Sequence, residues 1–138
     1  MSWRGTGREK MGTQAHIASL VLLVCLQWSS VDGQCGGTFT ELTGTLASPN
    51  YPDNYNNSLY CSYIIDVGSE YWVELMFVDF DLEWSGSYPC PLDNVLIDRY
   101  GSGGTEVYSG HLGTVGPIYE PGGRLDVIFE TDSSVTYR

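Results

Sequence analysis

The sequence predicts an all-β fold, either a β-sandwich or a β-barrel. No segment shows a convincing helical period, and turn-forming residues interrupt the chain throughout. Between the turns lie short runs rich in Tyr, Val, Ile and Phe, which favour pleated, half-buried surfaces. Short strands at regular spacing, separated by turn signals, are typical of these two architectures.

The clearest run spans residues 72–80 and alternates with the two-residue period of a half-buried strand. Further strands are predicted at residues 62–66, 95–100 and 125–129. The last strand leads into a turn near Thr131, with no later strand to pair with it, which would leave a sheet edge exposed. We therefore expect the sequence to be a fragment. In the clearest run, an apolar face of Val73, Leu75 and Phe77 alternates with a mixed face of Trp72, Glu74 and Met76.

The first residues have the organisation of a secretory signal peptide. A positively charged start precedes an apolar run at residues 17–26, and a plausible cleavage site lies before Gln34. The apolar run is shorter than the roughly 20 residues that a membrane-spanning helix needs. We therefore predict that residues 1–33 are removed and that residues 34–138 form one secreted, extracellular domain. The residues that carry this pattern are Arg4, Arg8, Lys10, Val31 and Gly33.

The predicted mature chain is strongly acidic. From Gln34 onward it contains 15 acidic and three basic residues, a net charge of −12. So few basic residues cannot neutralise phosphates, which argues against a nucleic acid or an anionic membrane surface as partner. Cations and basic protein surfaces are the expected partners.

Three cysteines remain after the predicted cleavage, namely Cys35, Cys61 and Cys90. The secretory route permits disulfides. Because three is an odd number, one cysteine is either unpaired or bonded to another chain.

Six segments, taken in order and spacing, resemble the CUB domain across essentially all of the predicted mature chain. The resemblance implies a CUB-like jelly-roll, an antiparallel two-sheet β-sandwich that is extracellular and serves as a binding module. The last strand of that family, a "GF-x-A-x-Y" run, is missing after Arg138. The segments are Cys35-Gly-Gly, Gly44-Thr-Leu-Ala-Ser-Pro-Asn-Tyr-Pro, Cys61-Ser-Tyr-Ile-Ile, Val73-Glu-Leu-Met-Phe-Val-Asp-Phe-Asp-Leu-Glu, Cys90-Pro-Leu-Asp-Asn-Val-Leu-Ile and Leu125-Asp-Val-Ile-Phe-Glu-Thr-Asp-Ser-Ser.

The resemblance also implies a calcium site at one end of the sandwich. Three converging carboxylates would repel one another unless a cation neutralised them. Hard oxygen ligands suit Ca²⁺. A transition metal is disfavoured, because His111 is the single histidine outside the predicted signal peptide. Carried over position by position, the ligands are Glu83, Asp93, Asp132 and Ser134, with Tyr55 in support.

The same resemblance pairs Cys35 with Cys61 in a disulfide, which would stabilise the domain by roughly 3 kcal/mol. It leaves Cys90 without a partner, because Ser109-Gly110 stands where the family has a Cys-Gly pair. We therefore predict an unpaired thiol at Cys90, through which an oligomer could form.

Two surface features complete the expectations. Asn56 begins the N-glycosylation sequence Asn-Asn-Ser on a predicted turn. Trp84 and Tyr88 are aromatics in the loop between Glu83 and Cys90, where they serve either as hot-spot residues for a partner or as loop packing.

The leading interpretation is an extracellular, calcium-dependent protein-binding module. Glu83, Asp93 and Asp132 would hold the ion and also accept a basic side chain of the partner through charge-assisted hydrogen bonds. Two alternatives remain open. One is a regulatory or assembly module of a secreted protease whose catalytic domain lies beyond the chain. The other is a carbohydrate- or cell-surface-binding module similar to spermadhesins.

Catalysis by the chain itself is not expected. Paired carboxylates such as Glu83 and Asp93 can hydrolyse glycosides, but no substrate groove can be argued from the sequence. Ser133 and Ser134 have no histidine base other than His111.

Overall fold

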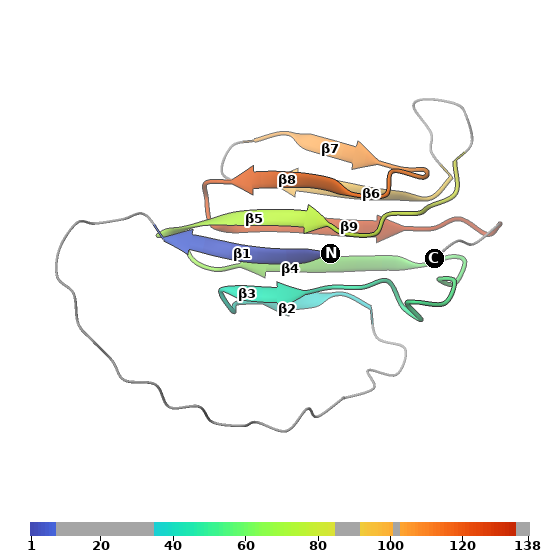
Figure 1. Ribbon diagram of the computed structural model, residues 1–138, viewed down its shortest axis with the longest axis horizontal. Coiled ribbons are helices and arrows are strands. Elements are labelled where there is room, and N and C mark those ends of the chain that lie inside the picture. Colours follow the sequence, from blue (N-terminus) through green and yellow to red (C-terminus); the bar gives the residue numbers. More distant parts are fainter. Residues whose placement is uncertain (8–34, 85–91, 101–102, 135–138) are drawn as a thin grey trace, which may run out of the picture.

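A computed structural model describes residues 1–7, 35–84, 92–100 and 103–134 of the chain. The described strands form two stacked sheets (Figure 1), one with the order β3-β1-β5-β8 and the other with the order β2-β4-β9-β6-β7. The predicted two-sheet sandwich is therefore confirmed. The strands are β1 (Ser2–Gly7), β2 (Gly37–Phe39), β3 (Thr43–Thr45), β4 (Tyr60–Asp66), β5 (Tyr71–Phe77), β6 (Asn94–Arg99), β7 (Thr105–Tyr108), β8 (Val115–Glu120) and β9 (Arg124–Glu130).

Alternate side chains of β5 are buried in the core, as predicted. Val73, Leu75 and Phe77 are buried between the sheets, whereas Trp72 is exposed. The strand ends at Phe77 and not at Phe80 as predicted. The chain turns there, and Phe80 folds back to pack edge-on against Phe77 with ring centroids 5.2 Å apart.

Among the described strands, the pairing is antiparallel except between β2 and β4. A disulfide joins Cys35, just before β2, to Cys61 at the start of β4. Because the bond joins the starts of both strands, they leave it side by side in the same direction. The predicted pairing of these two cysteines is confirmed.

The last described strand does not form the exposed edge that was expected. β9 lies in the middle of its sheet and pairs with β4 on one side and β6 on the other. Alternate residues of β9 are buried, namely Leu125, Val127 and Phe129. The sequence analysis missed this position because neighbours in a sheet are set by long-range pairing and not by order along the chain.

The structure places the first residues in the fold, which the sequence analysis did not expect. Ser2–Gly7 forms β1, which lies between β3 and β5. The indole of Trp3 is buried against the core, and the Arg4 guanidinium lies 2.6 Å from the Glu74 carboxylate. Cleavage before Gln34 stays a prediction, and it would remove this strand. No helix in the described ranges is long and apolar enough to cross a membrane.

Candidate metal centre

Three carboxylates converge at the end of the sandwich where β5 and β9 end and β6 begins (right-hand side of Figure 1). Glu83 follows β5, Asp93 immediately precedes β6, and Asp132 follows β9. One oxygen from each lies within 4.8 Å of the others. The sheets thus bring together three acids that are up to 49 residues apart in the sequence.

Asp93 is the most deeply buried member of the cluster, with no solvent-exposed surface. One carboxylate oxygen accepts a hydrogen bond from the Tyr55 hydroxyl, and the other accepts one from the Asp132 backbone N–H at 2.9 Å. Because both oxygens are engaged, the carboxylate is fixed in position and its charge is partly compensated by donors.

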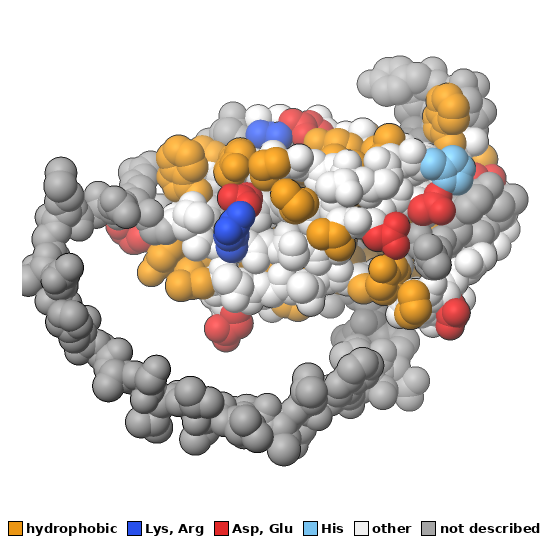
Figure 2. Space-filling view, viewed as in Figure 1, with side chains coloured by type: hydrophobic (Ala, Val, Ile, Leu, Met, Phe, Trp, Pro, Cys, Tyr) orange, Lys and Arg blue, Asp and Glu red, His pale blue; other side chains and the backbone are white. Residues whose placement is uncertain are grey.

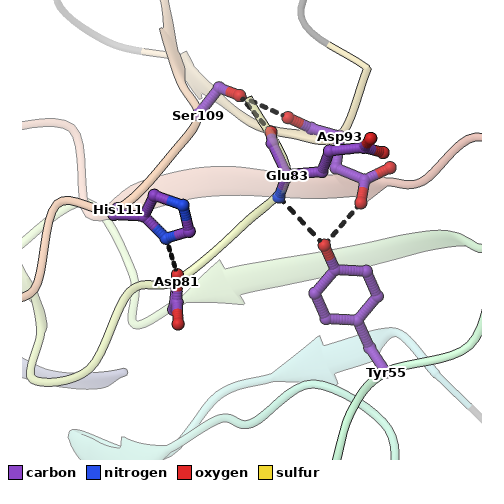
Figure 3. A network of polar contacts seen from close by, with 6 residues as sticks. All are labelled: Tyr55, Asp81, Glu83, Asp93, Ser109 and His111. Carbon is purple, nitrogen blue, oxygen red and sulfur yellow. Dashed lines mark hydrogen bonds and ion pairs between the residues drawn. The ribbon is translucent and has the colours of Figure 1, made fainter. Parts of the chain in front are cut away.

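Tyr55 connects two of the acids (Figure 3). Its hydroxyl donates to Asp93 and accepts a hydrogen bond from the Glu83 backbone N–H at 3.2 Å. The ring is 2% exposed and packs edge-on against Phe129, with centroids 5.3 Å apart. Tyr55 therefore links the Asp93 carboxylate to the Glu83 backbone from a buried position.

Ser134 connects the outer members of the cluster. Its hydroxyl lies 2.9 Å from one Asp132 carboxylate oxygen and 3.3 Å from a Glu83 carboxylate oxygen. The Ser134 backbone N–H also donates to Asp132 at 2.7 Å. All five residues that the sequence analysis proposed for the metal site consequently lie together.

Ser109, which replaces the expected cysteine, contacts the same cluster from the start of the next loop. Its hydroxyl lies 2.6 Å from the Asp93 carbonyl oxygen and 3.1 Å from the Glu83 carbonyl oxygen (Figure 3). It thereby ties together the backbones of two proposed ligand residues. The sequence analysis identified Ser109 only as a missing disulfide partner, because a hydroxyl that bonds to carbonyl oxygens leaves no spacing signal.

The sequence analysis also missed a contact between a histidine and a carboxylate beside the cluster. His111 Nδ1 pairs with the Asp81 carboxylate, and their backbones form an isolated β-bridge. Leu82 N–H donates to the Gly110 carbonyl oxygen at 3.1 Å, which extends the same contact. These bonds fix the segment that carries Glu83 against the segment that carries Ser109.

The electrostatics of the cluster favour a bound cation. Within the described ranges, no arginine or histidine forms an ion pair with Glu83, Asp93 or Asp132. Three carboxylates at this separation repel one another unless protons or a cation neutralise them. The donor set, carboxylate oxygens with hydroxyl oxygens beside them, suits Ca²⁺ better than a softer metal.

The remaining predicted surface residues are only partly described. Trp84 is 67% exposed next to Glu83, while Tyr88 and Cys90 lie outside the described residues. Asn56 is exposed, so the proposed glycosylation position is accessible.

The state of Cys90 is a prediction of its own. Mass spectrometry after alkylation without reduction should find this thiol labelled, or bonded to a second chain. The Cys35–Cys61 pair should stay unlabelled in the same sample and serve as the internal control. A bond between Cys90 and either of those cysteines would contradict the prediction.

Comparison with known proteins places these features in one family. The sequence model described as "CUB domain" matches residues 35–138. Protein SpAN of Strongylocentrotus purpuratus is 40% identical over 111 residues, which cover 78% of this chain and 17% of that protein. Mannan-binding lectin serine protease 1 of Rattus norvegicus is 36% identical over 105 residues, which cover 73% of this chain and 14% of that protein. The chain therefore spans less than a fifth of either relative.

A solved structure of a related domain shares the fold. The structure titled "Crystal structure of the MASP-1 CUB2 domain bound to Ca2+" superimposes with a TM-score of 0.59 at 31% sequence identity. The match covers 76% of this chain and 93% of that one.

Proposed function

The chain belongs to the CUB domain family, and from that premise we propose that it is an extracellular, calcium-dependent protein-binding module with no catalytic activity of its own. The observation that carries the proposal is the cluster of Glu83, Asp93 and Asp132, whose oxygens lie within 4.8 Å of one another. A calcium-bound relative of the same fold supports the choice of ion. The disulfide supports an extracellular location, because such bonds persist in oxidising compartments.

The ligand roles follow from the burial of each group. Asp93 is fully buried and would face the ion from within, whereas Ser134 is exposed and Asp132 half-buried at the surface. Calcium takes six to eight oxygen ligands. The protein atoms here leave places for water or for a group from a partner.

The partner that best fits this surface presents a lysine or arginine. Oxygens of Glu83 and Asp132 that do not ligate the ion could accept charge-assisted hydrogen bonds from it. The net charge of −12 from Gln34 onward would speed the approach of a basic partner. Trp84, exposed beside Glu83, offers apolar contact area for the same partner.

Calcium binding is tested by thermal unfolding. We expect a Kd of about 10⁻⁴ to 10⁻³ M, as in other extracellular modules. Calcium at about tenfold its Kd should stabilise the fold by about 1.4 kcal/mol, because the ion binds only the folded state. This corresponds to a rise of about 6–11 °C in the melting temperature. Asp132→Ala should abolish the rise, and Asp98→Ala, at an exposed position on β6, should keep it. No shift and no heat in calorimetry would refute the site.

The role of the carboxylates toward a partner requires a separate measurement. Once a basic partner is identified by calcium-dependent capture, Glu83→Gln should weaken its binding by about tenfold or more, because a paired charge is lost. Glu70→Gln is the matched control, since Glu70 is exposed at the opposite end of the sandwich. Chelation should abolish binding while the disulfide-bonded core stays folded. Equal binding in chelator would leave calcium as a structural ion only.

A second candidate function rests on one of the relatives. Mannan-binding lectin serine protease 1 is named as a protease, and the matched part is a small fraction of its length. The chain could therefore be a regulatory or assembly module within a longer protease. Such a module would have the same calcium site. The transcript downstream of Arg138 separates the two candidates, because only the second requires a catalytic domain there.

A further inference from the structure

The segment that follows β9 is held by a second segment, which lies outside the carboxylate cluster. Residues 56–59 precede β4 and residues 131–134 follow β9, so the two segments continue the β4–β9 pairing toward the proposed calcium site. The Thr131 N–H donates to the Leu59 carbonyl oxygen at 3.0 Å. The Thr131 hydroxyl accepts a hydrogen bond from the Leu59 N–H at 2.8 Å and donates to the Asn56 carbonyl oxygen at 3.0 Å. We call residues 56–59 the clamp segment.

Two further bonds from the clamp segment reach the residues around the proposed ligands. The Ser58 N–H donates to the Asp132 carbonyl oxygen at 2.5 Å. The Asn57 side-chain amide donates at 3.1 Å to the carbonyl oxygen of Ser133, which lies between two proposed ligand residues. The Asp132 N–H donates to the buried Asp93 carboxylate. Both backbone polar groups of Asp132 are therefore engaged, and its side chain leaves the backbone in a fixed direction.

The backbone of Ser58 is shaped for this contact. Its φ of 58° lies in the left-handed region, which residues other than glycine adopt rarely. Such a conformation persists only where the surrounding contacts hold it. The Ser58 N–H bond to Asp132 is one of these contacts. The local conformation of the clamp segment is therefore tied to the position of a proposed ligand residue.

Repulsion among the carboxylates opposes the observed position of Asp132. Oxygens of Glu83, Asp93 and Asp132 lie within 4.8 Å of one another and repel unless a cation neutralises them. Figure 2 shows more acidic side chains at this end of the molecule, the right-hand end in that view. Asp132 lies beyond the last residue of β9 and is less buried than Asp93, so repulsion acts to move it outward. The bonds to the clamp segment oppose this movement. A loop already held in its bound conformation binds more tightly, because less ordering is required.

We propose that the clamp segment holds Asp132 and Ser134 in position for calcium, and that Asn57 is a positioning residue of this site. The inference rests on the proposed calcium function. Asn57 acts through the Ser133 carbonyl oxygen and is not itself a ligand. By thermodynamic linkage, the factor by which the clamp segment raises calcium affinity is also the factor by which calcium stabilises the clamp segment. Calcium should therefore protect the Ser58 amide proton from exchange with solvent.

The test substitutes Asn57 by alanine in the full chain. Isothermal titration calorimetry with calcium should give a Kd about fivefold weaker than that of the wild type, because one hydrogen bond that orders the ligand loop is lost. The substitution keeps the glycosylation sequence that begins at Asn56, because its middle position accepts alanine. The melting temperature in chelator should stay close to that of the wild type, since Asn57 is exposed. A bond with a purely structural role would give the reverse result, a lower melting temperature in chelator and an unchanged Kd.

Three further variants isolate the hydrogen bonds. Asn57→Gln keeps an amide donor and should bind calcium within about twofold of the wild type. Thr131→Val removes the hydroxyl that bonds to two backbone groups, and should weaken calcium binding about tenfold. Thr105→Ala is the control, because Thr105 is exposed at the start of β7, at the opposite end of the sandwich (Figure 1), and should leave the Kd unchanged.

Hydrogen exchange followed by NMR measures the coupling from the other side. The Ser58 amide proton of the wild type should exchange more slowly in saturating calcium than in chelator, and Asn57→Ala should reduce this difference. Equal exchange in both conditions, or an Asn57→Ala chain with the Kd of the wild type, would overturn the proposal and leave the calcium site standing. A wild type that binds no calcium would instead refute the proposed function, and this inference with it.

Discussion

Asp93→Ala is expected to destabilise the calcium-loaded domain by about 3–5 kcal/mol, since hydrogen bonds to a charged group contribute about 1.5–3 kcal/mol each. The carboxylate is fully buried and accepts one bond from the Tyr55 hydroxyl and one from the Asp132 N–H. The substitution also removes a proposed calcium ligand, so the stabilisation from the ion is lost as well. Chemical denaturation in saturating calcium measures the combined loss of stability from the hydrogen bonds and from the ion.

The same variant should behave differently in chelator. Without the ion, removing one of three clustered carboxylates relieves repulsion between the other two, which offsets part of the loss. The cost of Asp93→Ala should therefore be smaller in chelator than in calcium. Asp98→Ala is the matched control, because Asp98 is exposed on β6, the strand that Asp93 immediately precedes, and it should change stability by less than about 0.5 kcal/mol. An Asp93→Ala chain as stable as the wild type in calcium would contradict the assignment of Asp93 to the site.

Removing the disulfide is the second change expected to lower stability strongly. Replacing Cys35 and Cys61 together by alanine should cost about 3 kcal/mol, because the unfolded chain loses the constraint of a closed loop between positions 26 apart in sequence. The melting temperature should fall by about 12 °C or more. Thermal unfolding followed by circular dichroism, in calcium and in chelator, compares the double variant with the wild type.

A reductant provides the control for this experiment. It should lower the melting temperature of the wild type toward that of the double variant and leave the double variant unchanged. The loss should be similar with and without calcium, since the disulfide joins β2 to β4 and neither cysteine belongs to the carboxylate cluster. A double variant that melts with the oxidised wild type would show that the sheet pairing alone fixes this edge.

The sequence determined the strands whose side chains alternate. β5 and β9 each bury every second residue, and this period can be read locally because a pleated strand points successive side chains to opposite faces. The runs that form β4, β6 and β9 were predicted from their content of Tyr, Val, Ile and Phe between turn signals. The short strands β3 and β7 carry no such signal, since a few exposed residues do not make a period.

The residues of the candidate site were also named from the sequence, but through the resemblance of their motifs and not through their spacing. Spacing could not have joined Glu83 to Asp132, because nothing local shows that the ends of β5 and β9 meet. The chain's acidity did exclude nucleic acid as the expected partner, because charge is a property of composition.

Only the tertiary structure decided which neighbours each segment has. It placed β9 in the centre of its sheet, put residues 2–7 between β3 and β5, and set the Ser109 hydroxyl against the backbones of Glu83 and Asp93. In each case the deciding contacts join residues far apart in the chain. The local sequence determines which side chains of each strand are apolar. The order of the strands depends on the free energy gained when two whole sheets bury their apolar faces together, and no single segment determines it.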